Sequence, residues 1–304
     1  MTQAHDSARL AGLGTEAVRP DLRDLDERST TDLVRLAIDE HHAVDAALEQ
    51  AVPAIEAAVD AVASRMRRGG RLIYLGAGTP GRLGALDAAE CPPTYGTDPD
   101  LVVAVVAGGA VGVVRSTEQS EDEGGAAVAA LEELGINEVD SVVGITASGR
   151  TPYVVEGLRA ARAFGALTVS VANNEDAESS SVAEIAIETP TGPELVAGST
   201  RLKAGTAQKI VLNALSTLVM VRLGKTFGNL MVDVAPGNEK LRDRGRRIVE
   251  AATGASSADA SSALEAAEGS VKQAVVMLLA DVSAEDAGRR LAEGRSVREA
   301  LAAS

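Results

Sequence analysis

Short apolar runs, each followed by small or polar residues, recur through the middle of the chain. The five runs are 72–75, 101–106, 141–145, 167–171 and 185–187. Patterns with helical spacing separate most of them, most clearly at 124–134 and 152–164. Short continuous apolar strands that alternate with helices are typical of a parallel sheet covered on both faces. The sequence therefore predicts an α/β fold in which a parallel sheet is the middle of three layers.

Helical patterns without strands lie on both sides of this region. Before it, apolar residues follow Ser29 at helical spacing, and a second helix is predicted from about Ala54 to Met66. After it, 204–223 has little polar face, as expected for a helix in a core or a subunit interface. Short helical patterns beyond Asn238 predict a small bundle. The predicted division is an N-terminal helical segment at 1–53, a sheet domain at 54–236 and a C-terminal helical domain at 237–304.

Charge and composition exclude several classes of function. The 304 residues include 29 Lys and Arg against 44 Asp and Glu, which gives a net charge of −15. An acidic surface repels phosphate backbones, and 2% aromatic residues supply few stacking platforms, so we expect no nucleic-acid partner. One Cys and three His cannot form a typical zinc site, so no metal is expected. No apolar run reaches the ~18 residues of a membrane span, and no signal-peptide pattern opens the chain. We therefore expect a cytoplasmic protein without a membrane partner.

A glycine loop, Gly76-Ala-Gly-Thr-Pro-Gly81, follows the first apolar run. It matches the G-x-G-x-x-G pattern of dinucleotide sites, which also needs an acidic residue at the end of the second strand. The second run ends in Ala107-Gly-Gly109, so a dinucleotide cofactor is not favoured. Gly78, Thr79 and the nearby Arg82 instead predict a cradle for a phosphate or a sugar. The prolines after Cys91 are expected to end the following helix.

A second candidate loop follows the third run. Ser148, Gly149, Arg150 and Thr151 come directly before Pro152, which suits the first turn of a helix. Two hydroxyls, a guanidinium and the N–H groups of a helix start are donors that suit a phosphate monoester. The alternative is ordinary helix capping by Ser148 or Thr151, and capping is compatible with anion binding.

Two glutamates and a lysine are further candidates. Glu90 lies before two prolines, and Glu121 lies in an acidic cluster before a glycine pair. On composition alone, a solvated helix end explains either glutamate. Lys203 opens the long apolar helix among other polar residues, which is typical of a ligand rim but also of a capped helix start.

Taken together, the motifs resemble those of the N-acetylmuramic acid 6-phosphate etherases, which carry a sugar-isomerase (SIS) type phosphosugar-binding domain. The matching stretches are 71–79, 90–96, 147–153, 203–209 and 228–234. They occur in one order and span most of the chain. One departure is Pro80, where many relatives have Ser, so a hydroxyl donor to the substrate is missing there.

The resemblance implies a lyase of cell-wall amino-sugar recycling. It would convert N-acetylmuramic acid 6-phosphate to N-acetylglucosamine 6-phosphate and D-lactate, by elimination and then addition of water, without a cofactor. The family's two carboxyl residues carry over to Glu90, which protonates the departing lactate oxygen, and Glu121, which removes the C2 proton. Because an acid and a base of the same type need different environments, Glu90 is expected to be the more buried, with a raised pKa.

Two other functions stay open on the same fold. The chain could be a phosphosugar sensor without chemistry, or an aldose–ketose isomerase that exchanges the C2 proton and releases no lactate. The SIS resemblance also implies a homodimer, for which the apolar helix at 204–223 offers an interface.

Overall fold

A five-stranded parallel sheet forms the centre of the first of two units in the computed structural model, which describes residues 13–115, 118–234, 239–294 and 296–303. The strands are β1 (Leu72–Gly76), β2 (Val102–Val106), β3 (Ser141–Thr146), β4 (Leu167–Ala172) and β5 (Ile185–Glu188). Their order in the sheet is β2-β1-β3-β4-β5. Every neighbouring pair is parallel, which confirms the predicted sheet.

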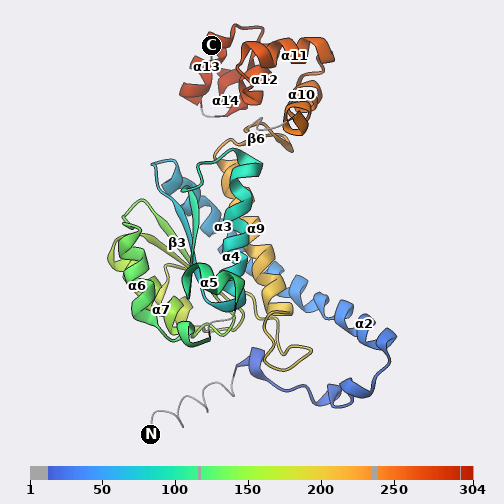
Figure 1. Cartoon of the computed structure of the whole chain (residues 1–304), viewed down its shortest axis with the longest axis vertical. Coiled ribbons are helices and arrows are strands. Elements are labelled where there is room, and N and C mark those ends of the chain that lie inside the picture. Colours follow the sequence, from blue (N-terminus) through green and yellow to red (C-terminus); the bar gives the residue numbers. More distant parts are fainter. Residues whose placement is uncertain (1–12, 116–117, 235–238, 295, 304) are drawn as a thin grey trace. The chain divides into compact units, whose positions relative to one another are not determined.

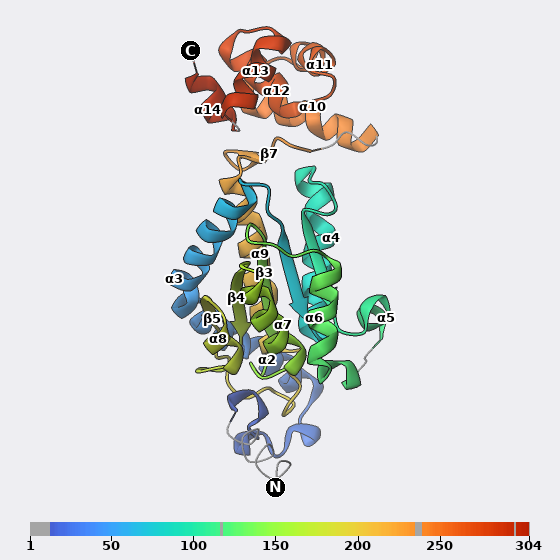
Figure 2. The same cartoon turned by 90° about the vertical axis from the view of Figure 1, so that its left-hand side faces the viewer.

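Helices cover both faces of this sheet (Figures 1 and 2). On one face, Gly144 of β3 lies close to Leu158 of α7 (Pro152–Ala163). Side chains of adjacent strand residues point to opposite faces, and the next residue, Ile145, lies close to Gly84 of α4 (Gly78–Tyr95). α7 and α4 therefore cover opposite faces, which confirms the three-layer arrangement.

The remaining helices of the first unit surround these layers. The longer ones are α2 (Thr30–Asp39), α3 (His41–Met66), α6 (Gly124–Glu133) and α9 (Lys203–Arg222), whose end belongs to the second unit. The short ones are α5 (Gly109–Val114), α8 (Glu178–Val182) and the 3-10 turns η1 (Gly14–Glu16), η2 (Pro20–Leu22), η3 (Leu25–Glu27) and η4 (Glu118–Glu121).

Two predicted helix boundaries are wrong. The break before Ala54 lies instead near Glu40, between α2 and α3, and α3 continues through Pro53. A proline inside a helix costs about 3 kcal/mol, but the buried face of α3 extends to both sides of Pro53 and outweighs this cost. Likewise α4 continues through the prolines after Cys91 as far as Tyr95, so Glu90 lies inside a helix.

The second unit is a small helical bundle, as predicted. It comprises Glu90–Pro99 and Thr217–Ser304, and the rest of the chain belongs to the first unit. Its helices are α10 (Glu239–Thr253), α11 (Ser257–Ala266), α12 (Val271–Ala280), α13 (Ala284–Gly294) and α14 (Val297–Ala302). A hairpin of β6 (Thr226–Phe227) and β7 (Leu230–Met231), which the sequence analysis missed, precedes them. The three-part division at 53 and 236 stays a prediction.

Among the described helices, α9 is long and apolar enough to cross a membrane by length and composition. However, 56% of its apolar window is buried inside the structure. Packing within the protein therefore accounts for its apolar character, as expected for a core helix.

Candidate functional site

The topology of the sheet indicates where a ligand binds. The chain passes from β1 outward to β2 and then returns to β3 on the other side of β1. Such a reversal opens a crevice at the carboxyl ends of the two central strands, where ligands of open α/β sheets bind. The two loops predicted to bind phosphate or sugar follow β1 and β3, so both lie at this edge.

The glycine loop after β1 turns sharply into α4. Gly81 packs so tightly on Gly76 that a Cβ atom at Gly81 would lie 2.6 Å from the Gly76 carbonyl oxygen. Gly78, the first residue of α4, has φ +58°, a conformation that side chains disfavour. At the other side of the loop, the Cγ2 atom of Thr79 lies 3.5 Å from the Cβ position of Gly205, in the first turn of α9. The start of α4 therefore lies against the start of α9.

Glu121 reaches this loop from a distant part of the sequence. A Cβ atom at Gly78 would lie 2.7 Å from the Glu121 Oε1 atom. η4 carries Glu121, which is partly buried. A predicted carboxylate and a predicted cradle residue thus lie against each other at the crevice.

The loop after β3 is organised around the Thr146 hydroxyl, which the sequence analysis missed. The Thr146 and Thr151 Oγ1 atoms are 2.8 Å apart, and the Gly149 N–H donates to the Thr146 hydroxyl at 3.2 Å. The Arg150 N–H donates to the Ser148 hydroxyl at 3.2 Å. Thr151, the N-cap residue of α7, makes no side-chain capping bond. The capping alternative is therefore wrong for Thr151. The signal that could have identified Thr146 is its hydroxyl at the end of a predicted strand.

Gly149 fits this loop because of its backbone and its surroundings. Its φ is +76°, and a Cβ atom there would lie 2.4 Å from the Cβ atom of Ala177. The Ser179 N–H donates to the Gly149 carbonyl at 2.8 Å. The loop after β3 is thus fixed from both sides before any ligand binds.

At the start of α9, carboxylates of the protein itself accept the hydrogen bonds of the backbone N–H groups and of the Lys203 ammonium. The Lys203 and Ala204 N–H groups donate to the Glu194 carboxylate at 3.0 and 2.9 Å, and Glu194 is buried. The buried Lys203 ammonium pairs with Glu40 at 2.5 Å. Arg19 also pairs with Glu40. Sequence reasoning missed both glutamates, because nothing in the local pattern connects residues so far apart.

The charge of Glu40 is set by opposing effects. Burial disfavours the charged form, but hydrogen bonds from Lys203 and Arg19 outweigh it and hold the pKa of this carboxyl below its usual range. Lys203 therefore faces a permanent anion at neutral pH. Lys203 is a predicted substrate contact, and in this structure its ammonium is paired with Glu40.

Two more candidates, Arg82 and Glu90, lie on α4. The Arg82 Nε–H donates to the Gly112 carbonyl at 3.2 Å, so this guanidinium is bound to α5. Glu90 is exposed, whereas Glu121 is partly buried. The expectation that Glu90 is the more buried of the two is therefore wrong for the single chain. Its place inside α4, after the buried Asp87, leaves its side chain at the helix surface.

Buried amides connect the neighbouring strand ends beneath the site. The Gln208 Nε2–H donates to the Asn173 Oδ1 atom at 2.8 Å, and Asn173 donates to the Thr189 hydroxyl at 2.9 Å. Asn174 donates to the Ala147 carbonyl at 2.9 Å. These bonds fix the segments after β3, β4 and β5 to α9.

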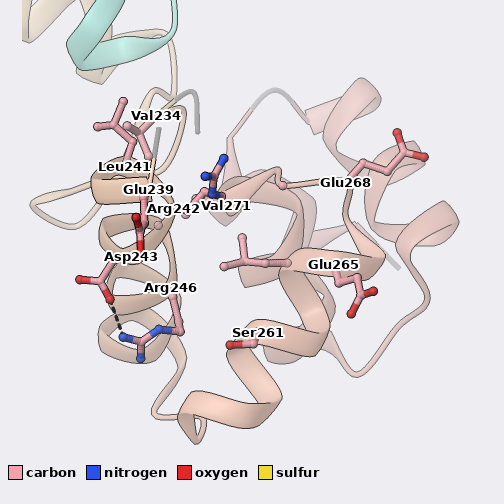
Figure 3. A pocket seen from close by; sticks show the side chains of 13 residues that line it. Val234, Glu239, Leu241, Arg242, Asp243, Arg246, Ser261, Glu265, Glu268 and Val271 are labelled. Atoms are coloured by element: carbon pink, nitrogen blue, oxygen red, sulfur yellow. Dashed lines mark hydrogen bonds and ion pairs between the residues drawn. The ribbon is translucent and has the colours of Figure 1, made fainter. Parts of the chain in front are cut away.

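A separate cavity of about 640 Å³ lies within the second unit, between α10, α11 and α12 (Figure 3). Its charged lining residues are Glu239, Arg242, Asp243, Arg246, Glu265 and Glu268. Acids outnumber bases, and Arg246 is paired with Asp243 at 2.6 Å. The cavity contains none of the predicted site residues and does not suit a phosphate.

Comparisons with known proteins agree with this architecture. Residues 54–162 match the glucokinase regulatory protein N-terminal SIS domain, and residues 124–218 match the SIS domain. The chain is 55% identical to an N-acetylmuramic acid 6-phosphate etherase from Streptomyces coelicolor, over 98% of this chain and 96% of the relative. Etherases from Rubrobacter xylanophilus and Mycolicibacterium smegmatis are 52% and 51% identical, over 96% and 97% of this chain and 97% and 99% of theirs. The SIS-type fold expected from the sequence is confirmed.

Proposed function

Since the chain belongs to the N-acetylmuramic acid 6-phosphate etherase family, we propose that it is a carbon–oxygen lyase that cleaves the D-lactyl ether of N-acetylmuramic acid 6-phosphate. The products are N-acetylglucosamine 6-phosphate and D-lactate, and the reaction serves amino-sugar catabolism. No cofactor is proposed, because a carboxylate base can remove the C2 proton once ring opening makes C1 an aldehyde.

Glu121 is the proposed base, and Glu90 is the proposed acid. Removal of the C2 proton expels the lactate oxygen from C3, and this oxygen takes a proton from Glu90. Water then adds across C2 and C3: its oxygen bonds to C3 as Glu90 takes up a proton from it, and Glu121 returns a proton to C2. The observation that carries the proposal is the contact of the Glu121 carboxylate with Gly78, because it sets a base against the glycine cradle at the crevice between β1 and β3.

The sugar and its phosphate are proposed to bind at the two loops. Gly78 and Thr79 would contact the sugar, and the donors of residues 148–151 would bind the phosphate. Lys203 is proposed as a further contact, which would share its ammonium between Glu40 and the substrate. Arg82 is proposed as a further contact of the phosphate or sugar, while its Nε–H donates to the Gly112 carbonyl.

A homodimer in the cytoplasm is part of the same proposal. α2 buries none of its residues, and two of its apolar side chains, Val34 and Ile38, are more than half exposed. Apolar side chains that remain exposed together in one chain are typical of a subunit interface.

Incubation of the protein with N-acetylmuramic acid 6-phosphate in deuterated water tests the proposal. We expect release of D-lactate and uptake of deuterium at C2. Glu121→Gln should lose both, whereas Glu90→Gln should lose lactate release and keep C2 exchange. Binding without either signal would indicate a sensor, and C2 exchange without lactate from the unchanged protein would indicate an isomerase.

A further inference from the structure

The N-terminal segment 13–22 contacts the proposed site, although it lies far before β1 in the sequence. Three of its residues, Leu13, Thr15 and Leu22, are buried. Thr15 of η1 is fully buried and is hydrogen-bonded to Asn174, which follows β4 and lies 159 positions further along the chain. The segment is therefore packed on the loops at the carboxyl ends of the strands.

The Asn174 side chain connects Thr15 to the loop after β3. Its Oδ1 atom accepts from the Thr15 N–H at 3.4 Å, and its Nδ2 atom donates to the Thr15 hydroxyl at 3.0 Å and to the Ala147 carbonyl at 2.9 Å. An asparagine amide has two N–H donors and one carbonyl oxygen, and in the buried Asn174 all three are bonded. Because the Thr15 N–H can only donate and the Ala147 carbonyl can only accept, the amide has one satisfied orientation.

The Ala147 carbonyl directly precedes Ser148, the first residue of the proposed phosphate-binding loop. It accepts from the Asn173 N–H at 3.1 Å as well as from the Asn174 side chain. On the other side of Ser148, the Gly149 carbonyl is also hydrogen-bonded. The backbone is thus held on both sides of Ser148, and the bond from the Asn174 amide is one that a side-chain substitution can remove.

We propose that Thr15 is a positioning residue of the site: by holding the amide of Asn174, it fixes the Ala147 carbonyl and thereby the donors of residues 148–151. This inference rests on the proposed function, in which these donors bind the phosphate. Without the Thr15 hydroxyl, one buried Nδ2 proton loses its acceptor, which is unfavourable. The amide then turns toward another acceptor, its bond to Ala147 weakens, and the loop holds its donors less precisely.

Other contacts anchor the rest of the segment. Leu13 and Leu22 are buried, and Arg19 is paired with the Glu40 carboxylate. Removal of the Thr15 hydroxyl should therefore leave the segment in place and the protein folded. An effect on the phosphate-binding loop can then be measured by itself.

Thr15→Val keeps the branched shape of the side chain and removes the hydroxyl. We expect the KM for N-acetylmuramic acid 6-phosphate to rise about tenfold, the effect of about one lost hydrogen bond, with kcat within about twofold of the wild type. Thr15→Ser keeps a hydroxyl and should keep the wild-type KM. Thr191→Val is the matched control, because Thr191 is buried but its hydroxyl has no hydrogen-bond partner among the described residues.

Three outcomes would overturn the positioning role of Thr15. The first is a wild-type KM in Thr15→Val, and the second is an equal rise of KM in Thr191→Val. The third is loss of the fold in Thr15→Val, measured by circular dichroism and a urea titration, because Thr15 would then act on the fold as a whole.

Asn174→Ala tests the same connection from its other end, because it removes all three bonds of the amide. If Thr15 acts through Asn174, the double variant Thr15→Val/Asn174→Ala should have the same KM as Asn174→Ala alone. Rises in KM that multiply in the double variant would mean that the two residues act separately, and would contradict the proposal.

Binding of inorganic phosphate separates the failure of this inference from the failure of the proposed function, because it needs no reaction. We expect the Kd for phosphate, measured by titration calorimetry, to rise about tenfold in Thr15→Val and to stay unchanged in Thr191→Val. An unchanged Kd in Thr15→Val, with lactate release by the wild type intact, would overturn the positioning role and leave the etherase function standing. A raised Kd in Thr15→Val, with no lactate release by the wild type, would support the positioning role and overturn the function.

Discussion

The loops after β1 and β3 and the start of α9 carry similar polar residues, but these residues have different hydrogen-bond and ion-pair partners. In the loop after β3, the Thr146 hydroxyl bonds to Thr151 and to the Gly149 N–H, so the bonds stay within the loop and shape it. At the start of α9, the donors go to carboxylates from elsewhere. Glu194 accepts two backbone N–H groups, and Glu40 pairs with Lys203.

The difference teaches that a cation at a helix start does not by itself indicate an anion site. In a chain with 44 acidic and 29 basic side chains, internal carboxylates compete with any ligand for each donor. At the start of α9 they have neutralised the helix end and the ammonium. The loop after β3 is shaped by hydroxyls, which add no competing charge. Substitutions in the loops after β1 and β3 are therefore expected to change activity, and substitutions at the start of α9 to change stability.

The largest expected effect is at Glu121. Glu121→Gln removes the base but keeps the size of the side chain, so we expect lactate release to fall by ~10²–10⁴-fold with the unfolding midpoint unchanged. Glu123→Gln, two residues later and exposed, is the matched control and should behave like the wild type. Loss of activity in Glu123→Gln rather than in Glu121→Gln would contradict the assignment of Glu121 as the base.

The contact between Gly78 and Glu121 should give the next largest effect. Gly78→Ala puts a methyl group 2.7 Å from the Glu121 Oε1 atom, at a φ of +58°. Gly109→Ala has nearly the same φ, +59°, but nothing lies within 4 Å of the added atom. Both variants carry a similar backbone strain of about 1 kcal/mol. We expect kcat/KM to fall by about tenfold more in Gly78→Ala, and equal rates would show that the contact does not matter.

The fold was largely predictable, and the pairings within the site were not. Alternation of apolar runs and helical patterns located all five strands of the parallel sheet, because parallel strands that are buried on both faces are nearly continuous apolar runs. Local rules failed where tertiary packing outweighed them, as at Pro53 in α3. Glu121 against Gly78 and Glu40 against Lys203 join residues that are distant in sequence. Such pairs depend on the path of the whole chain, which periodicity does not encode.

A moderate effect on stability is expected at Glu194. Glu194→Gln leaves one good acceptor for the two N–H groups of Lys203 and Ala204, and it removes the charge at the helix start. We expect the free energy of unfolding to fall by about 1 kcal/mol in a urea titration, with kcat nearly unchanged. If the start of α9 were instead the main phosphate site, loss of the competing carboxylate would tighten binding of the phosphosugar. A marked fall in KM without loss of stability would thus reverse the assignment of the two regions.

The smallest expected effect is confined to acid pH and concerns Glu40. Its folded pKa lies below the usual 4.5, because the hydrogen bonds from Lys203 and Arg19 outweigh the cost of burial. A depressed carboxyl pKa contributes stability that is fully present above 4.5 and is lost as the pH falls through the folded value. The difference in free energy of unfolding between wild type and Glu40→Gln should therefore shrink as the pH is lowered below 4.5. Urea titrations across this range measure it, and a difference that stays constant or grows would mean that the ion pair with Lys203 does not stabilise the fold.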